Sequence, residues 1–296
     1  MVDDRRQWTH AIAGAALTTD AAGATAGSPS DRIDTSVAHP ARRYNYWLGG
    51  KDNFQADRES GDAITAAFPT VRTAALENRR FLQRTVGYLA REAGIRQFLD
   101  IGTGIPTANN THEVAQAIAP ETRVVYVDND PIVLAHARAL LTSSTAGATA
   151  YIDADLRDPQ RILAHPELIR AIDLSQPVAL MLVAVLHFLA DDDNPYALVR
   201  QLLDVLPAGS YLVASHGTHD HLPPAVAADF RAKARGGGPH GLINLRTRDE
   251  FARFFTGLDL VEPGITSVAE WRAEGEAQPR PSTDEVGMYG GVARLP

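Results

Sequence analysis

Strand-like and helix-like segments alternate along the middle of the chain, and this rhythm limits the possible folds more than any other feature. Short apolar runs read as strands, and the segments between them carry apolar residues on one helical face. The predicted strands are 95–102, 122–128, 148–154, 177–189 and 209–216, and the predicted helices between them are 111–119, 131–141 and 194–206. This alternation predicts an α/β protein with a parallel sheet and right-handed crossovers.

The segments on either side extend this core. Residues 70–93 place apolar residues on one face of a helix before the first strand. The last third is less regular, and its helix at 247–255 begins with a capping box of Thr247 and Glu250. The other segments predicted there are a helix at 223–235, a flexible loop at 235–241, and strands at 258–265 and 286–295. The two late strands bring the predicted sheet to seven.

Composition narrows the class of protein. Of 296 residues, 45% are hydrophobic and 22% are charged, which is the balance of a globular protein. The chain has no cysteine, so it has no disulfides, thiolate catalysis or Cys-ligated metal, and it suits a reducing cytoplasm. A net charge of −8 disfavours a nucleic-acid partner. No run approaches the ~20 apolar residues of a membrane span. We therefore expect a cytoplasmic protein without nucleic-acid or membrane partners.

The first candidate site is the stretch FLDIGTGIPT, residues 98–107, where the first predicted strand ends. Asp100 lies at that end, and the turn of Gly102, Thr103 and Gly104 leads toward the next helix. Glycines in such a turn let the backbone approach a ligand closely, and a helix N-terminus offers free N–H groups. The pattern predicts a ligand site, although turns of this kind also occur in α/β proteins that bind nothing there.

The same stretch bears on a rival hypothesis, an NAD(P)-dependent oxidoreductase on a similar sheet. The dinucleotide fingerprint would have a third Gly or Ala where this chain has Thr107. Pro106 removes an N–H group that a pyrophosphate would use. Both residues favour a ligand without phosphates.

Acidic residues also end the second and third predicted strands. Asp128 can accept hydrogen bonds from both hydroxyls of a ribose, and Asn129 can frame an adenine edge. Asp155 can accept an exocyclic amine of adenine, and the backbone N–H of Leu156 can reach a ring nitrogen. The alternatives are an N-cap at Asn129 or Asp130, and an ordinary solvated loop at Asp155. Because three such strand ends meet at one edge of the sheet, their coincidence predicts a nucleoside-type ligand.

These motifs together resemble an actinobacterial family of S-adenosylmethionine-dependent methyltransferases, long filed as a domain of unknown function. The resemblance runs from about residue 36 to the C-terminus. It rests on FLDIGTGIPT, VVYVDNDPIVLAHARALL, YIDADLRDP, VALMLVAVLHFL and SYLVASHGT, with RRYNYWLGGKDNFQADRE upstream. It implies a Rossmann-like class I methyltransferase fold, with seven mostly parallel strands and an antiparallel last strand. The family often has Asp where this chain has Asn45.

The resemblance also implies roles for individual residues. Asp100, Gly102 and Gly104 would line the methionine part of S-adenosylmethionine. Asp128 would bind its ribose and Asp155 its adenine. The residues after the fourth strand, Ala184 and Val185, would face the methionyl amine.

The stretch ARRYNYWLGGKDNF, residues 41–54, lies upstream of the predicted sheet. We expect residues 40–69 to fold as helix and turn over the carboxyl edge of the sheet. The Gly-Gly turn would let Lys51 and Asn53 approach the carboxylate of the cofactor. Tyr46 would help to form an aromatic wall for the sulfonium or for a flat acceptor, and is therefore also a catalytic candidate. The alternative is a packing motif that only anchors the N-terminal segment.

These expectations divide the chain into three parts. Residues 1–36, rich in small residues, would form a poorly ordered tail. Residues 37–93 would form a helical cover, or lid. Residues 94–296 would form the cofactor-binding Rossmann-like domain.

Histidines at strand ends are the candidates for acid–base catalysis. His187 follows the fourth strand and His216 follows the fifth, so both would lie on the ligand edge. Either could also be structural. No spaced His/carboxylate set predicts a metal site, and methyl transfer does not require one.

The acceptor is predicted by analogy alone to be a small molecule of natural-product metabolism, methylated on N, O or C, with an indole-type ring carbon included. The protein could form a homodimer. A non-catalytic protein that binds S-adenosylmethionine, as a sensor or partner subunit, is a second rival, because it would keep the same cofactor residues.

Overall fold

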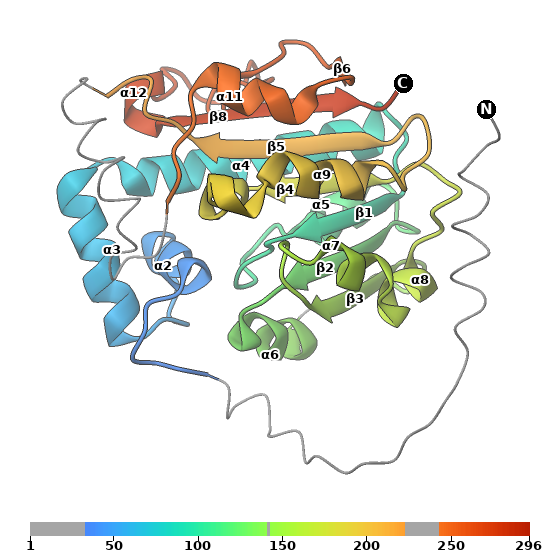
Figure 1. Ribbon diagram of the computed structural model, residues 1–296, viewed down its shortest axis with the longest axis horizontal. Helices are drawn as coiled ribbons and strands as arrows, with labels where there is room; N and C mark the ends of the chain where they lie inside the picture. Colours follow the sequence, from blue (N-terminus) through green and yellow to red (C-terminus); the bar gives the residue numbers. More distant parts are fainter. Residues whose placement is uncertain (1–32, 141–142, 223–242) are drawn as a thin grey trace.

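The computed structural model describes residues 33–140, 143–222 and 243–296, which form a sheet with helices on both faces (Figure 1). Residues 1–32 of the predicted tail lie outside these ranges, as do the predicted helix at 223–235 and the loop at 235–241. In the described ranges, no helix is long and apolar enough to cross a membrane.

The described residues form one sheet of eight strands. Its order is β3-β2-β1-β4-β5-β8-β6, and β7 also pairs with β8. β1 to β5 run parallel to one another, whereas β8 is antiparallel to β5. The strands are β1 (Gln97–Ile101), β2 (Arg123–Asp128), β3 (Ala148–Asp153), β4 (Ala179–Val183), β5 (Tyr211–Gly217), β6 (Asp259–Leu260), β7 (Thr266–Ser267) and β8 (Met288–Arg294).

This sheet confirms the predicted class and corrects two details. The segment predicted as one strand at 258–265 contains only the two-residue β6, and β7 follows it, so the strand count rises from seven to eight. The fourth strand is shorter than the apolar run at 177–189, because Ala184 has a positive φ of 56° that ends the extended backbone. The remainder of that run continues as a 3₁₀-helix, η2 (Leu186–Phe188).

Two apolar cores cover the two faces of the sheet. Along β4, Leu180 and Leu182 belong to one core, while Ala179 and Met181 belong to the other. This alternation explains why the strand is apolar throughout. The first core includes residues of α7 (Pro159–Leu163), α8 (Pro166–Ala171), α9 (Pro195–Leu203) and α11 (Arg248–Ala252), and the second includes residues of α4 (Val71–Arg91) and α5 (Thr111–Ile118).

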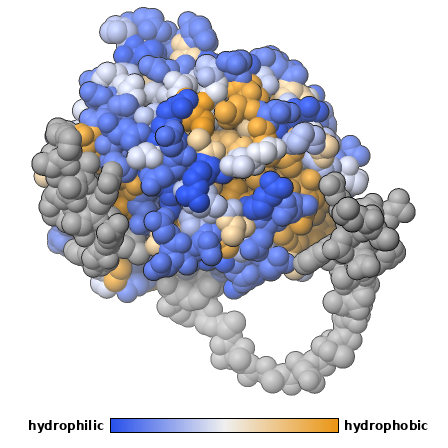
Figure 2. Space-filling model, turned by 45° about the horizontal axis from the view of Figure 1, so that its top comes forward, coloured by the Kyte–Doolittle hydropathy of each residue, from blue (hydrophilic) through white to orange (hydrophobic). Residues whose placement is uncertain are grey.

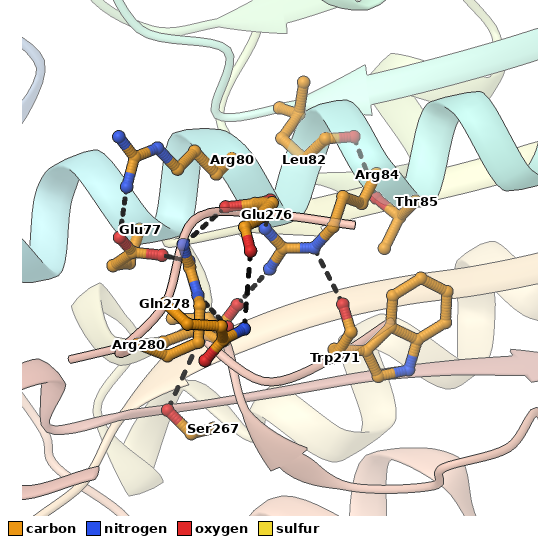
Figure 3. A network of polar contacts seen from close by, with 12 residues as sticks. Glu77, Arg80, Leu82, Arg84, Thr85, Ser267, Trp271, Glu276, Gln278 and Arg280 are labelled. Atoms are coloured by element: carbon orange, nitrogen blue, oxygen red, sulfur yellow. Dashed lines mark hydrogen bonds and ion pairs between the residues drawn. The ribbon is translucent and has the colours of Figure 1, made fainter. Parts of the chain in front are cut away.

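Helix α4 also holds a C-terminal segment against the body of the molecule (Figure 3). Arg84 donates to the carbonyl oxygen of Trp271 at 2.7 Å and pairs with Glu276. Glu77 pairs with Arg280, whose guanidinium also reaches Glu276 at 2.7 Å. Because the apolar face of α4 lies in the second core, this helix of the predicted cover packs as part of the sheet domain.

The surface is mostly polar. On the face shown in Figure 2, hydrophobic residues gather in a central patch that hydrophilic residues surround. Among the described residues, the large hydrophobic side chains that are exposed are Val37, Leu76, Ile169, Val205 and Leu260. The homodimer expected from the sequence stays a prediction.

Candidate functional site

A cavity of about 480 Å³ lies at the carboxyl ends of β1 to β4. The loops after these strands form one wall. The other wall comes from α2 (Pro40–Trp47), α3 (Gln55–Ala67) and the first half of α4, with residues of α12 (Thr283–Val286) and the two residues after it. Figure 1 shows α2 and α3 beyond this edge of the sheet. The volume falls within the range of about 300–1,000 Å³ that small-molecule sites occupy.

The glycine turn after β1 lines the cavity, as the sequence predicts. Gly102 has a φ of +76°, and a Cβ atom there would lie 2.4 Å from Cγ2 of Val185, so only glycine fits. Gly104 has a φ of +69°, and no described atom lies within 4 Å of its Cβ position. Thr103 lies between them, and its hydroxyl donates to the carbonyl oxygen of Asp100 at 3.0 Å.

One expectation about this turn is wrong. The next helix, α5, begins at Thr111 with Asn110 as its N-cap, several residues after Gly104. The free N–H groups of a helix N-terminus therefore do not lie at the glycines, which is a further difference from a pyrophosphate-binding turn.

Asp100 and Asp128 line the cavity as buried carboxylates. The hydroxyl of Thr111 donates to Oδ2 of Asp100 at 2.6 Å, but burial dominates and raises the pKa of Asp100 to about 6. Asp128 accepts the N–H of Gly104 at 2.8 Å and the N–H of Asp130 at 2.9 Å, one on each oxygen. Burial raises the pKa of Asp128 against these two bonds. Each oxygen keeps a lone pair for a hydroxyl donor.

The loop after β3 also lines the cavity at the carboxyl edge of the sheet. Asp155 and Leu156 line the cavity, and so does Asn129 from the neighbouring loop. The side-chain amide of Asn129 donates to Oδ2 of Asp155 at 2.8 Å, so the two predicted adenine contacts lie together. Arg157 also holds Asp155, through its backbone N–H at 2.8 Å.

The alternative assignment of an N-cap also holds, on a different residue. Asp130 accepts the N–H of Ile132 at 3.1 Å at the start of α6 (Pro131–Leu140). Its carboxylate also pairs with the guanidinium of Arg42 at 2.9 and 3.0 Å, which ties α2 to this loop. Asp128 is left to face the cavity.

Ala184 and Val185 line the cavity after β4. The strained backbone of Ala184 is held by its N–H, which donates to the hydroxyl of Ser215 at 2.9 Å. A chain of hydrogen bonds continues from there: Ser215 to Oδ1 of Asn78 at 2.6 Å, Asn78 to the hydroxyl of Tyr44 at 3.0 Å, and Tyr44 to the carbonyl of Ala75 at 2.9 Å. This chain connects β4 and β5 with α4 and α2.

Helix α2 presents one face to the cavity. The α2 residues that line it are Pro40, Ala41, Arg43, Tyr44 and Trp47, and all of them except Ala41 occupy the i, i+3, i+4 and i+7 positions of one helical face. Aromatic side chains of the opening motif therefore do reach the site, through Tyr44 and Trp47.

Three predicted cofactor residues do not line the cavity that the described chain forms: Tyr46, Lys51 and Asn53. Tyr46 falls on another face of α2 and donates to Oδ1 of Asp62 at 2.8 Å. Lys51 is exposed. The amide of Asn53 is used inside its own turn, where it donates to Oδ1 of Asn45 and to the carbonyl of Gly50, both at 2.9 Å. The alternative of a packing motif describes these residues better, and Tyr46 is not placed for catalysis.

His187 lies in the cavity lining, on η2, which follows β4. Its side chain is buried, and Nδ1 has no hydrogen-bond partner in the described chain. Burial, with the charges of Arg246 and Arg43, lowers the pKa of His187 to about 3. The imidazole is therefore neutral at physiological pH and a weak base.

His216, the other predicted catalytic histidine, has the surroundings expected of its structural alternative. It is 1% exposed and does not belong to the described cavity lining. Its Nδ1 lies 2.7 Å from the carbonyl oxygen of Gly217, and its Nε2 lies 3.0 Å from a guanidinium nitrogen of Arg246. Since arginine can only donate, Nε2 accepts and Nδ1 carries the proton. Burial holds the pKa of His216 well below its usual range.

The sequence-based reading missed Arg43. Its side chain lines the cavity and is 1% exposed, and burial lowers its pKa to about 10. The sequence did contain one indication that Arg43 belongs to the site: it lies four residues before Trp47, which puts both side chains on one face of a helix.

The strand order, the antiparallel last long strand and a carboxylate-lined site at the carboxyl edge define a Rossmann-like methyltransferase fold. Residues 26–296 match the family described as S-adenosyl methyltransferase, and the chain belongs to this family.

Two solved structures resemble it over most of their length. A DUF574 family protein from Streptomyces avermitilis is 49% identical, with a TM-score of 0.82, over 90% of this chain and 100% of that one. A putative methyltransferase from Thermobifida fusca is 42% identical, with a TM-score of 0.79, over 92% and 99%. No curated protein matches the chain.

The protein is therefore a methyltransferase that uses S-adenosylmethionine, and the predicted family is confirmed. This finding decides against the oxidoreductase. The site itself fits the cofactor: its carboxylates suit hydroxyl and amine donors, and no helix begins at the glycine turn to hold a pyrophosphate.

Proposed function

We propose that the protein methylates an apolar small molecule held between the helical wall and the strand ends. The observation that carries this proposal is the apolar lining that the second wall and the segments after β5 add to the carboxylate edge. These apolar residues are Ile64, Phe68, Val71, Leu222, Leu245, Val286 and Met288. A largely apolar cavity with a few polar groups is typical of sites for small molecules.

We assign the cofactor to the strand-end wall. The turn after β1 and the residues after β4 would hold the methionine part, and the ends of β2 and β3 would hold the adenosine. The residues in these roles are Asp100, Gly102, Thr103, Gly104, Ala184 and Val185 for methionine, and Asp128, Asn129, Asp155 and Leu156 for adenosine. Their support is that all of them line one cavity.

The residues of this chain then supply alignment and a dry site. Bound S-adenosylmethionine supplies a methyl group already activated on a sulfonium. Tyr44 and Trp47 cover the cavity and exclude water, while the chain from Ser215 to Tyr44 fixes the cover relative to Ala184. Neutral His187 orients the acceptor through a hydrogen bond and contributes little as a base.

The apolar acceptor fits natural-product metabolism, which we propose by analogy with other bacterial enzymes of this fold. Methylation on N, O or C, including an indole-type ring carbon, is compatible with the cavity lining.

A screen of apolar acceptors tests the proposal. Each compound is incubated with the full chain and S-adenosylmethionine, and release of S-adenosylhomocysteine is measured. We expect turnover with at least one apolar small molecule and none with peptides or RNA of similar charge. Turnover confined to a macromolecular substrate would contradict the proposal.

A further inference from the structure

Arg43 is a buried cation with unused donors. Its Nε has no partner among the described residues, and one terminal nitrogen makes a long bond of 3.4 Å to the hydroxyl of Ser60. Asp57 is the acid whose charge acts on it. The two oxygens of Asp57 each accept a backbone N–H group, from His39 and Phe54 at 2.8 Å, and the described contacts include no hydrogen bond from Arg43 to Asp57.

A buried charge without a close partner is unfavourable, and an anion is what would stabilise it. In the described chain, Arg43 forms no ion pair with an acid, although it lines the cavity. A fork of guanidinium donors in an apolar surrounding binds a carboxylate or another oxyanion strongly.

His187 offers a second unused donor in the same cavity. Its Nδ1 is buried without a partner in the described ranges, and its side chain is only 9% exposed. The neutral imidazole can carry its proton on Nδ1 and donate it to an anionic oxygen. Arg43 and His187 are close enough for the charge of one to act on the other.

We propose that Arg43 and His187 form an anion-binding subsite, and that the methyl acceptor is an apolar molecule that binds there with one anionic oxygen group. The group is a carboxylate or a phenolate, which share the chemistry that this subsite recognises. The inference rests on the proposed function, since it places the anion on the acceptor. The other anion that could bind at this subsite is the carboxylate of the cofactor, and the experiment below distinguishes it from an anion on the acceptor. Arg43 and its neighbour Ser60 belong to the helical wall, opposite the strand ends assigned to the cofactor.

The experiment is calorimetric titration of the full chain saturated with S-adenosylhomocysteine. The probes are two matched pairs: 2-naphthoate with 2-naphthamide, and 2-naphthol with 2-methylnaphthalene. We expect the acidic member of at least one pair to bind about tenfold more tightly, because it gains charge-assisted hydrogen bonds. Titration of 2-naphthol in buffers of different ionisation heat shows whether it binds as phenolate, which distinguishes the two sources of the anion.

Variants of Arg43 test whether this subsite causes the tighter binding of the acidic probe. Arg43→Met should abolish the preference for the acid and leave the affinity for S-adenosylhomocysteine unchanged, and Arg43→Lys should keep part of the preference. Arg72→Met is the matched control, because Arg72 is exposed and does not belong to the cavity lining of the described chain. It should bind all probes as the natural chain does.

Three results would overturn the inference. The first is that the natural chain binds the acid and its neutral partner equally, or binds neither. This result needs no variant, so it overturns the inference even if Arg43→Met does not fold. The second is loss of cofactor affinity in Arg43→Met with the acid preference intact. The third is turnover of neutral acceptors only, which would leave the proposed function standing.

Discussion

The negative charge of Asp100 lowers the folding stability of the cofactor-free protein. The residue is 4% exposed, and burial raises the pKa of its carboxyl to about 6 from an ordinary 3.8. The folded chain therefore holds this proton more tightly than the unfolded chain does. As pH rises from 4 through 6, ionisation of Asp100 removes stability from the fold.

We predict that Asp100→Asn stabilises the cofactor-free protein at pH 7.5 by roughly 1–3 kcal/mol, since the amide keeps an oxygen for the hydroxyl of Thr111 without the buried charge. The gain should disappear by pH 4, where the natural carboxyl is protonated in the fold. Chemical denaturation at both pH values measures it. The exposed Asp192→Asn is the control and should show no such pH dependence. An equal gain at both pH values would refute the explanation.

The strand-end acids could be predicted because a general rule places them: carboxyl ends of parallel strands meet at one edge. Asp100, Asp128 and Asp155 all follow it. Arg43 and His216 could not be assigned in this way. Their surroundings come from distant segments, such as Ser60 for Arg43 and Arg246 for His216, and single-sequence spacing does not reveal such contacts.

At the scale of elements, α2 is held to the body by the hydrogen-bond chain from Ser215 through Asn78 to Tyr44. Asn78 is the shared middle member, with one partner on its oxygen and another on its nitrogen. Removing either end leaves a buried group of Asn78 unpaired, which costs free energy.

We predict that Tyr44→Phe and Ser215→Ala each lower the free energy of unfolding by about 1–3 kcal/mol. The double variant should lose less than the sum of the two, by about 0.5–3 kcal/mol, because both act on Asn78. Urea denaturation of the four proteins gives the coupling. Tyr46→Phe serves as the control, since its hydroxyl bonds to the exposed Asp62, and it should change stability little. Additive effects would show that the chain does not act as a unit.

Helices and strands were predicted well where the hydrophobic periodicity extends over many residues, as in α4. They were predicted poorly where the backbone conformation of a single residue decides where an element ends. The apolar run at 177–189 reads as one strand, but the positive φ of Ala184 ends it. The opening motif reads as one cluster, but helical geometry sends Tyr44 and Tyr46 to different faces of α2.

For the whole molecule, the arginine–glutamate cluster of Figure 3 joins the C-terminal segment to α4. Glu77 is 2% exposed at its side chain and pairs with Arg80 and Arg280. Neutralising it would leave the mostly buried guanidinium of Arg280 without this counter-charge.

We predict that Glu77→Gln destabilises the protein by about 3 kcal/mol, the order expected when one partner of a buried ion pair is removed. The control is Glu92→Gln, whose pair with Arg272 is more exposed and should contribute under about 1 kcal/mol. Thermal and urea denaturation compare the two variants. Equal effects would mean that burial of the cluster does not matter.

The position of Trp47 has a spectroscopic consequence. The chain has three tryptophans, of which Trp47 lines the cavity and Trp271 is fully buried in the core. A ligand that enters the cavity changes the polarity around the indole of Trp47 and leaves that of Trp271 as it was. The protein thus contains an intrinsic fluorophore at its candidate site, and occupancy can be followed by a change in its emission without a label.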